Sequence, residues 1–370
     1  MNKPKRFLIF LSLISLIGIG TIKADIKSIV IDDIDNSPII AASVFDASGN
    51  ILGLTDNYGY LPAHTASHYP LTIRCISYEP QVVTSPTDSI GMIACSYDLD
   101  EIVVVEGERN VLKLTCYVRE YSSLSNKNDS SITYNEHMVD FFIPRHKKAK
   151  FKGKYTPRTL ASRCYSLNKF NGEDSLSVSN DESLWLNLAK IDSTTLYEPK
   201  SFKNSKEIVK SETIKGKYFI STISRKTPNI YSVSEDKLAD EKEHKFSPWI
   251  LKMFGLSTDF TKLYTTSTYY PSTNGAYKPE DLISTSLSMD AVARGKIYRN
   301  VTNSDKPLDM KMLIELYVAD KEFISADEAK IQSKEKPNNV SFIIPKSAPK
   351  LDPKILKLIE RAKSQKTNRK

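Results

Sequence analysis

The chain has 370 residues, of which 40% are hydrophobic and 26% are charged, and its formal net charge is +8. This composition is that of a folded protein and excludes a wholly disordered chain, and the length suffices for two or more domains. Beyond the N-terminus no apolar stretch approaches the roughly 20 residues that span a bilayer, which excludes a polytopic bundle of membrane helices.

The first 24 residues have the organisation of a cleaved export signal. Lys3, Lys5 and Arg6 precede an uncharged, mostly apolar run from Phe7 to Ile22, and Ala24 is a suitable last residue before cleavage. The run is about 16 residues long, so an uncleaved membrane anchor is the less favoured alternative. We therefore expect a protein of the periplasm or outer membrane, with the cell surface as a further option.

Residues 25–106 show short β-branched stretches separated by turn residues. In the turn that ends at Tyr60, Gly59 is the residue able to adopt a positive φ, and Asp56 can accept hydrogen bonds from its own turn. Such alternation of short strands and turns predicts a β-sandwich. The strands are expected at Ile29–Ile34, Ile40–Phe45, Ile51–Leu54, Leu71–Tyr78, Val82–Thr84 and Ile90–Tyr97.

Four motifs follow one another in this region. They are PIIAASV at Pro38–Val44, GLTDNYGY at Gly53–Tyr60, LTIRCISY at Leu71–Tyr78 and LDEIVVV at Leu99–Val105. This series resembles the carboxypeptidase-regulatory-like domain, with Ser77 where that family usually has glycine. The resemblance implies a transthyretin-like or Ig-like sandwich of about seven strands without catalytic residues of its own. Such domains also precede the plugs of TonB-dependent receptors, but no plug follows here.

Residues 107–333 are expected to form a sheet-rich antiparallel domain with a few short helices, so the whole chain is predicted to be mostly β. The order of a YVRE strand at Tyr117–Glu120, a strand at Ile132–Pro144 and a later basic stretch resembles a segment often found after the same sandwich in exported proteins. That resemblance implies a curved sheet like those of lipoprotein carriers, without known catalytic residues. Further strands are expected at Ile214–Ile223, Leu263–Tyr270 and Met310–Asp320, a loop at Asn171–Glu182, and helices starting at Ser247 and, through a capping box, at Ser325.

Residues 334–370 are expected to be a basic tail, in which Asp352 and Pro353 can start a short helix that continues to about Ala362. A basic amphipathic helix of this kind predicts peripheral contact with an anionic membrane. The sandwich region carries the opposite charge, because twelve acidic residues stand there against only Lys27 and Arg74. The opposite charges can help the two parts dock, or they can serve solubility alone. Export argues against nucleic acid as a partner.

The sequence offers few candidates for chemistry, and we expect no catalytic residue, no cofactor and no metal. His64 and His68 have a zinc-like spacing, but Pro62 and Pro70 flank them and oppose a helix. The acidic groups at Asp32–Asp35 and Asp46–Asn50 are explained better by turns than by calcium. No nucleophile elbow or phosphate-binding loop is present. The disulfide state of Cys75, Cys95, Cys116 and Cys164 stays open.

A tyrosine-rich stretch provides the candidate ligand-binding residues. Tyrosine rings stack on sugars or peptides, although such residues also occur on the solvated face of a sheet. These candidates are Tyr264, Tyr269, Tyr270 and Tyr277.

We expect an exported, non-catalytic binding or assembly module whose partners are other envelope proteins or glycans. The first alternative is an envelope hydrolase with an accessory sandwich, which a pocket that gathers His137, Arg119 and Glu120 would favour. The second alternative is a surface adhesin that binds glycans through the tyrosine-rich stretch. Neither the oligomeric state nor the identity of the partner follows from the sequence.

Overall fold

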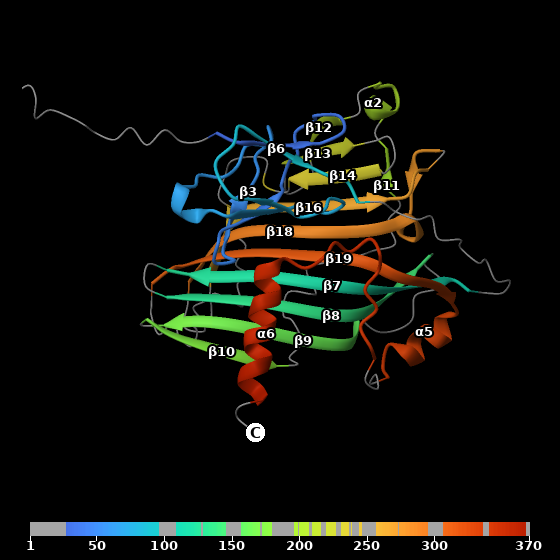
Figure 1. Ribbon diagram of the computed structural model, residues 1–370. Coiled ribbons are helices and arrows are strands. Elements are labelled where there is room, and N and C mark those ends of the chain that lie inside the picture. Colours follow the sequence, from blue (N-terminus) through green and yellow to red (C-terminus); the bar gives the residue numbers. More distant parts are fainter. Residues whose placement is uncertain are drawn as a thin grey trace, which may run out of the picture.

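The computed structural model confirms that the protein is mostly β, with antiparallel sheets and few helices (Figure 1). The export signal, the strand expected at 99–105 and the helix expected from Ser247 lie outside the described residues. The structure describes residues 27–95, 109–126, 129–145, 157–170, 172–179, 196–198, 200–206, 209–215, 220–226, 231–236, 238, 244–245, 257–272, 274–294, 306–335 and 340–367.

The N-terminal part is a small sandwich of two sheets. In one sheet β1 (Ile29–Asp32) and β6 (Ser89–Met92) pair in parallel, and the other sheet has the order β3-β2-β4-β5. The strands of this second sheet are β2 (Ser43–Phe45), β3 (Ile51–Leu54), β4 (Leu71–Arg74) and β5 (Gln81–Val83), and the 3-10 helix η1 (Ala66–His68) precedes β4. The core between the sheets consists of apolar side chains such as Val30, Val44, Ile73, Ile90 and Met92.

The turn before Tyr60 forms as its residue types predict. Gly59 has a φ of +79°, and a Cβ atom on it would lie 2.7 Å from the carbonyl oxygen of Val30. One carboxylate oxygen of Asp56 accepts hydrogen bonds from the backbone N–H groups of Tyr58 and Tyr60, each at 2.9 Å. Ser77 also has a positive φ, of +74°.

The remainder of the described chain forms an 11-stranded antiparallel sheet in the order β10-β9-β8-β7-β19-β18-β16-β14-β13-β12, with β15 paired to β16. The last long strand, β19, therefore lies between β7 and β18. The bounds are β7 (Val111–Ser125), β8 (Ser130–Pro144), β9 (Arg158–Phe170), β10 (Glu173–Ser179), β12 (Val209–Lys215), β13 (Ile220–Lys226), β14 (Tyr231–Asp236), β15 (His244–Lys245), β16 (Ser257–Tyr269), β18 (Leu282–Arg294) and β19 (Leu308–Ile324). Short elements beside it are β11 (Leu196–Tyr197), which pairs with β17 (Ala276–Tyr277), α2 (Lys200–Lys203) and η4 (Pro279–Asp281).

The strands expected at Leu263–Tyr270 and Met310–Asp320 are confirmed as parts of β16 and β19. Two other expectations were wrong. The loop expected at Asn171–Glu182 contains β10, a polar edge strand that pairs with β9 along its whole length. The single strand expected at Ile214–Ile223 is instead the end of β12 and the start of β13, which pair as neighbours.

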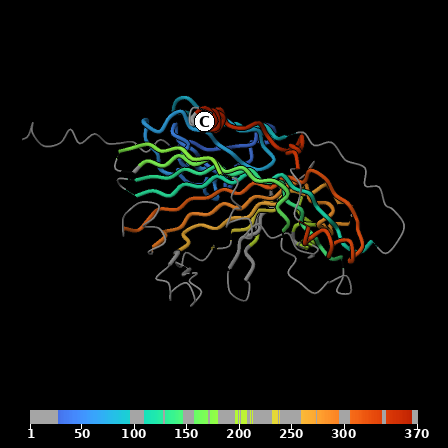
Figure 2. The backbone as a smooth tube through the Cα atoms, turned by 90° about the horizontal axis from the view of Figure 1, so that it is seen from below, coloured from blue at the N-terminus to red at the C-terminus, as the bar shows by residue number. Residues whose placement is uncertain are grey.

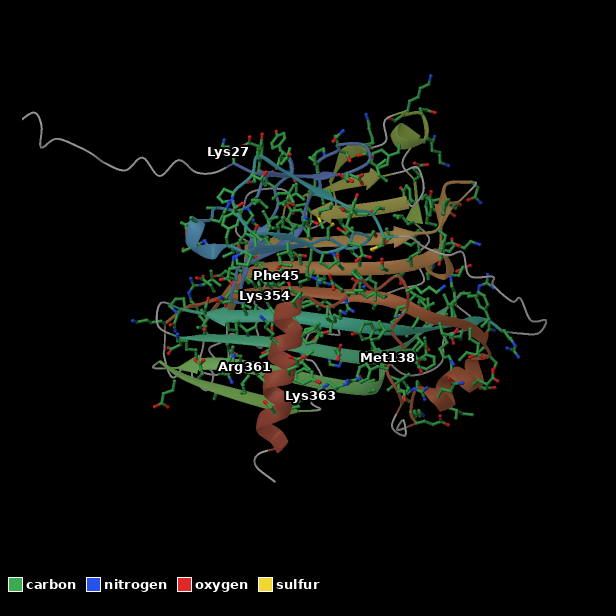
Figure 3. All side chains as sticks on the ribbon, viewed as in Figure 1. Lys27, Phe45, Met138, Lys354, Arg361 and Lys363 are labelled. Carbon is green, nitrogen blue, oxygen red and sulfur yellow. The ribbon has the colours of Figure 1, made fainter. Side chains whose placement is uncertain are left out.

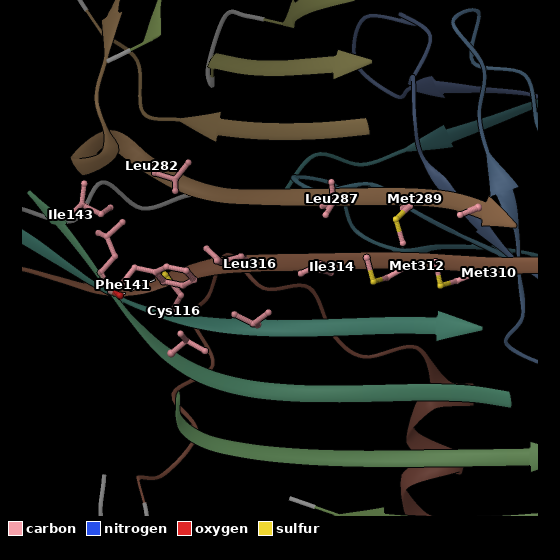
Figure 4. Packing of buried hydrophobic residues seen from close by; sticks show 14 of the residues in the cluster. Cys116, Phe141, Ile143, Leu282, Leu287, Met289, Met310, Met312, Ile314 and Leu316 are labelled. Carbon is pink, nitrogen blue, oxygen red and sulfur yellow. Dashed lines mark hydrogen bonds between the residues drawn. The ribbon is translucent and has the colours of Figure 1, made fainter. Parts of the chain in front are cut away.

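Successive residues of each long strand point to opposite faces of the sheet. Leu114, Cys116 and Val118 of β7 face one side, where they join the largest apolar cluster among the described residues (Figure 4). Tyr117 and Tyr121 point to the other side, where the sandwich and α6 (Pro353–Thr367) lie together (Figure 2). We call these two sides the apolar face and the sandwich face.

Both predicted C-terminal helices are present. Ser325 caps α5 (Ala326–Gln332) through a complete capping box with Glu328. Helix α6 crosses the strands of the sheet (Figure 1), and its residues Ile355, Leu358, Ile359 and Ala362 are buried against the sheet. Among the described residues, no helix combines the length and hydrophobicity of a membrane span.

Candidate functional site

A row of alternating charges crosses four strands on the sandwich face. The strand register places Glu315 of β19 opposite Arg119 of β7, Arg119 opposite Glu136 of β8, and Glu136 opposite Arg163 of β9. Glu315, Arg119 and Glu136 are buried, whereas Arg163 lies at the more open end of the row. We call these four residues the charge ladder.

Tyrosines flank the ladder on both sides. Tyr121, Tyr134 and Tyr165 occupy the neighbouring register position on one side, and Tyr317 and Tyr117 occupy it on the other. The rings of Tyr121 and Tyr134 are 5.0 Å apart, and those of Tyr134 and Tyr165 are stacked at 6.4 Å.

The phenol groups connect the charges of the ladder. The hydroxyls of Tyr117 and Tyr134 both donate to Oε1 of Glu136, at 2.6 and 3.0 Å. Nε of Arg119 in turn donates to the oxygen of Tyr117 at 3.3 Å. Burial raises the pKa of Tyr117 to about 12, although the nearby Arg119 acts in the opposite direction. The phenol is therefore neutral near neutral pH and remains a hydrogen-bond donor to Glu136.

The sandwich places one arginine on the ladder. Arg74, the last residue of β4, donates through Nε and Nη2 to the two carboxylate oxygens of Glu315, at 3.2 and 2.7 Å. Its guanidinium carbon lies 5.1 Å from the centre of the Tyr121 ring. Bidentate pairing of this kind fixes orientation as well as distance.

Several polar atoms at this junction are buried without a hydrogen-bond partner in the described part of the protein. They are Nη1 of Arg74, Oγ of Ser43 and the hydroxyls of Tyr121 and Tyr317. Buried polar groups are normally hydrogen-bonded, and each one left unpaired costs about 1 to 3 kcal/mol.

The residues after α5 cover the rest of the ladder, and we call residues 340–367 the arm. The carbonyl oxygen of Pro349 accepts a hydrogen bond of 2.6 Å from Nη1 of Arg119. The ring of Phe342 lies 3.8 Å from the guanidinium carbon of Arg163 and meets the ring of Tyr117 edge-on, with the ring centres 6.4 Å apart.

Lys354 joins the arm to the sandwich. Its Nζ donates to the carbonyl oxygens of Asp46 and Pro70, at 2.7 and 3.1 Å. Figure 3 shows Lys354 at the end of α6 nearest the sandwich, close to Phe45, and Arg361 and Lys363 farther along the helix. From the sheet, Lys311 reaches the sandwich in the same way and donates to the carbonyl oxygen of Leu52 at 2.8 Å. Two lysines of the basic remainder of the chain thus contact main-chain oxygens of the acidic sandwich.

On the apolar face, His137 and Glu120 lie side by side. Nε2 of His137 is 3.5 Å from Oε2 of Glu120, and the two side chains are 0% and 2% exposed. Asn135 donates to the same carboxylate at 3.0 Å. Neither ring nitrogen of His137 makes a hydrogen bond within the described residues, so no described serine or cysteine is positioned as a nucleophile for it.

The residues suggested for a hydrolase pocket do not meet in one place. His137 and Glu120 share the apolar face, whereas Arg119 points to the sandwich face. A pocket of about 150 Å³ lies elsewhere, between Ile143, Arg145 and Glu280. In the described ranges, no three His, Cys, Asp or Glu side chains are grouped as metal ligands.

The four candidate tyrosines do not form one platform. Tyr277 is only 5% exposed and stacks on Tyr231 at 3.8 Å, and Tyr269 packs beside it at 5.7 Å. The ring of Tyr270 lies 4.9 Å from Nζ of Lys321. Tyr264 points away from Tyr269 to the opposite face of the sheet, and burial together with Asp236 raises its pKa.

The other candidate residues either make local hydrogen bonds within turns or, in the case of the cysteines, form no disulfide. His64 contacts the carbonyl oxygen of Pro62 and the hydroxyl of Tyr69, and Nδ1 of His68 accepts from the backbone N–H of Thr65. Asp46 accepts hydrogen bonds from the backbone of Ser48 and Asn50, as a turn residue does. None of the four cysteines forms a disulfide: Cys95 and Cys116 are buried, and Cys75 and Cys164 are partly exposed.

Comparison with known proteins yields no relative that assigns a function. No family model matches the chain, and no curated protein matches it. A chain from structural studies of acetoacetate decarboxylase aligns with 58% of this chain and 89% of its own length, at 6% identity and a TM-score of 0.11. A score this low does not indicate a shared fold. The distinguishing feature of the structure is the packing of the sandwich and the arm on the charge ladder and its flanking tyrosines.

Proposed function

We propose that the protein is an exported, non-catalytic module of the Gram-negative cell envelope that binds or assembles with other envelope components. In this proposal the N-terminal sandwich is a carboxypeptidase-regulatory-like domain, and the large sheet supplies the interaction surface. The observation that supports it most is the composition of the sandwich face. Arginine and tyrosine are the residues that protein interfaces favour, and they are concentrated there around the charge ladder.

The charged groups of this face already have a binding role. Arg74 and Glu315 neutralise each other, and Arg119 holds a main-chain carbonyl of the arm. Ion pairs and hydrogen bonds to main-chain carbonyls of this kind fix the position of a bound segment, and neither requires a side chain that reacts chemically. This favours a binding or assembly protein over an enzyme.

Two measurements test the proposal. The chain, expressed with its own N-terminus in a Gram-negative host, should lose its first 24 residues and fractionate with the periplasm or the outer membrane. The purified mature protein should show no turnover with panels of ester, glycoside and peptide substrates. Retention of the intact N-terminus in the cytoplasmic fraction, or robust turnover, would overturn the corresponding half of the proposal.

A hydrolase remains the second candidate, because His137 lies 3.5 Å from Glu120 and a carboxylate–imidazole pair is the usual base of nucleophilic catalysis. If the substrate panels reveal activity, His137→Ala and Glu120→Gln should abolish it, whereas His68→Ala, which changes a partly exposed histidine at the end of η1, should not. Activity that survives both changes in the pair would remove this candidate site.

A further inference from the structure

One end of the large sheet carries a pocket that the proposed function does not use. The pocket has a volume of about 150 Å³ and lies where β7 begins and β8 ends, beside η4. Among the described residues that line it, none belongs to the charge ladder or to the arm. A cavity of about this volume is large enough for a molecule the size of benzene.

Part of the pocket lining is apolar. Leu112 of β7 lies opposite Ile143 of β8 in the strand register, and both side chains are buried. They belong to the apolar cluster, in which Figure 4 shows Ile143 and Leu282 at this end of the sheet. Pro144 and Pro279 add two rigid rings to the lining. This side of the pocket therefore favours an apolar group over water.

The charged part of the lining has two cations and one carboxylate. Nη2 of Arg145 and Nζ of Lys278 lie 3.5 and 3.7 Å from the same oxygen, Oε1 of Glu280. The two cationic side chains are 45% and 50% exposed, whereas that of Glu280 is 13% exposed. Neither charged group of the two cations donates a hydrogen bond to the described residues, so both retain donors for a second anion.

The protein holds both cations in place without a ligand. The backbone N–H of Arg145 donates to the carbonyl oxygen of Asn110 at 3.0 Å, and its guanidinium carbon lies 4.7 Å from the centre of the Phe323 ring. The backbone N–H of Lys278 donates to the carboxylate of Asp281 at 2.9 Å. A pocket whose charged groups are already positioned loses little conformational entropy when a ligand binds.

We propose that this pocket binds a compact organic carboxylate. The carboxylate lies between Arg145 and Lys278, and the apolar body of the molecule packs against Leu112 and Ile143. An apolar cavity with a few converging polar groups is the usual construction of a small-molecule site. This inference goes beyond the proposed function, because the pocket is separate from the surface that carries that proposal.

Benzoate is the probe, since its ring suits the volume of the pocket and its carboxylate suits the two cations. Benzamide has nearly the same shape without the charge, and inorganic phosphate has the charge without the apolar body. We expect a ligand-detected NMR titration of the purified protein to show saturable benzoate binding with a dissociation constant of about 1 mM or lower. Benzamide and phosphate should each bind at least about tenfold more weakly.

A double variant tests the two cations. Arg145→Gln/Lys278→Gln should weaken benzoate binding at least about tenfold, because it removes both positive charges of the lining. The matched control is Arg294→Gln, which changes another half-exposed arginine, paired with Asp259 at the opposite end of β18. This control should leave the affinity for benzoate unchanged. Thermal unfolding of each variant checks that the fold is retained.

Glu280→Gln gives a readout that a merely structural role would not produce. The carboxylate of Glu280 competes with the ligand for the same two cations, so its removal should tighten benzoate binding about threefold or more and leave benzamide binding unchanged. Four results would each overturn the proposed site: no saturable binding of benzoate, equal binding of benzamide or phosphate, an unchanged affinity in the double variant, or weaker benzoate binding by Glu280→Gln. None of them bears on export or on turnover, so the proposed envelope function would stand.

Discussion

Arg74 and Glu315 are 241 residues apart in the sequence, and they form a bidentate ion pair in which each side chain is 2% exposed. The pair joins the last residue of a sandwich strand to the centre of the large sheet. A buried pair gains little over well-packed apolar side chains, because both charges lose their hydration. Its clearer role is to fix the position of the sandwich on the large sheet, because a sandwich in any other position would leave two buried charges unpaired.

Breaking this pair on one side should be costly. Glu315→Leu leaves the charge of Arg74 buried, and the free energy of unfolding should fall by about 3 to 5 kcal/mol. The double change Arg74→Met/Glu315→Leu removes both charges and should recover most of that loss. Urea unfolding of the single and double variants measures the effect, and a single variant as stable as the double one would contradict this account.

Ser77 combines backbone strain with a contact between the two parts of the protein. Its φ is +74°, and its hydroxyl donates to Oγ1 of Thr268 in the large sheet at 3.0 Å. Ser77→Gly should relieve about 1 to 2 kcal/mol of strain and lose a hydrogen bond worth about 1 kcal/mol, so its stability should remain near that of the native protein. Ser77→Ala keeps the strain and loses the bond, so it should be the less stable of the two. Thermal unfolding that ranks them in the opposite order would exclude this explanation.

Two glycines with positive φ allow steric clash to be separated from backbone strain. A Cβ atom at Gly59 would lie 2.7 Å from the carbonyl oxygen of Val30, whereas at Gly49 nothing lies within 4 Å. Gly49→Ala should therefore cost only the strain, about 1 to 2 kcal/mol, and Gly59→Ala should cost more. Equal losses in urea unfolding would show that the turn before Tyr60 relaxes around the added methyl group.

Local patterns predicted the elements whose signal lies in a few adjacent residues. The strand period around Ile314, the capping box at Ser325 and the turn at Gly59 are all of this kind. The edge strand β10 was missed because its residues are mostly polar, and its pairing with β9 decides its conformation. Strand propensity does not report such tertiary context.

The candidate site depended on register, which no local pattern contains. Arg119 and Glu120 are adjacent in the sequence, so the two-residue period of a strand sends them to opposite faces, and only Glu120 lies beside His137. The same period could have placed Tyr117, Arg119 and Tyr121 together, since they alternate within one strand. That Arg119 would lie opposite Glu315 could not be foreseen, because a pairing across nearly 200 residues is decided by the assembled sheet.

The protein should lose stability at alkaline pH through its buried phenols and thiols. Burial raises the pKa of Tyr117 and that of Cys95 to about 12, and it also raises the pKa of Tyr121 and Tyr134. Because the folded chain holds these groups neutral, their contribution is complete below the unfolded pKa values and is lost as the pH rises from about 9 toward 12.

Urea unfolding as a function of pH measures this loss. Tyr117→Phe removes one of the titrating groups and should make the decline in stability with pH less steep. Tyr58→Phe, at a residue that is 72% exposed, should leave the slope unchanged. A stability that is flat up to about pH 11 would contradict the prediction.

We expect Lys354 to hold the arm, residues 340–367, in its closed position on the rest of the protein. Lys354 donates to two carbonyl oxygens of the sandwich, and hydrogen bonds from charged groups are worth about 1.5 to 3 kcal/mol. Lys354→Met should thus speed chymotrypsin cleavage within residues 340–367 by roughly tenfold or more, since cleavage follows the population of the open form.

Lys357→Met changes an exposed lysine of the same helix and is the matched control. The global unfolding of the sheet should change little in either variant, because the strands keep their own pairing when the arm opens. If both variants were cleaved at the native rate, α6 and the ladder contacts would hold the arm without Lys354.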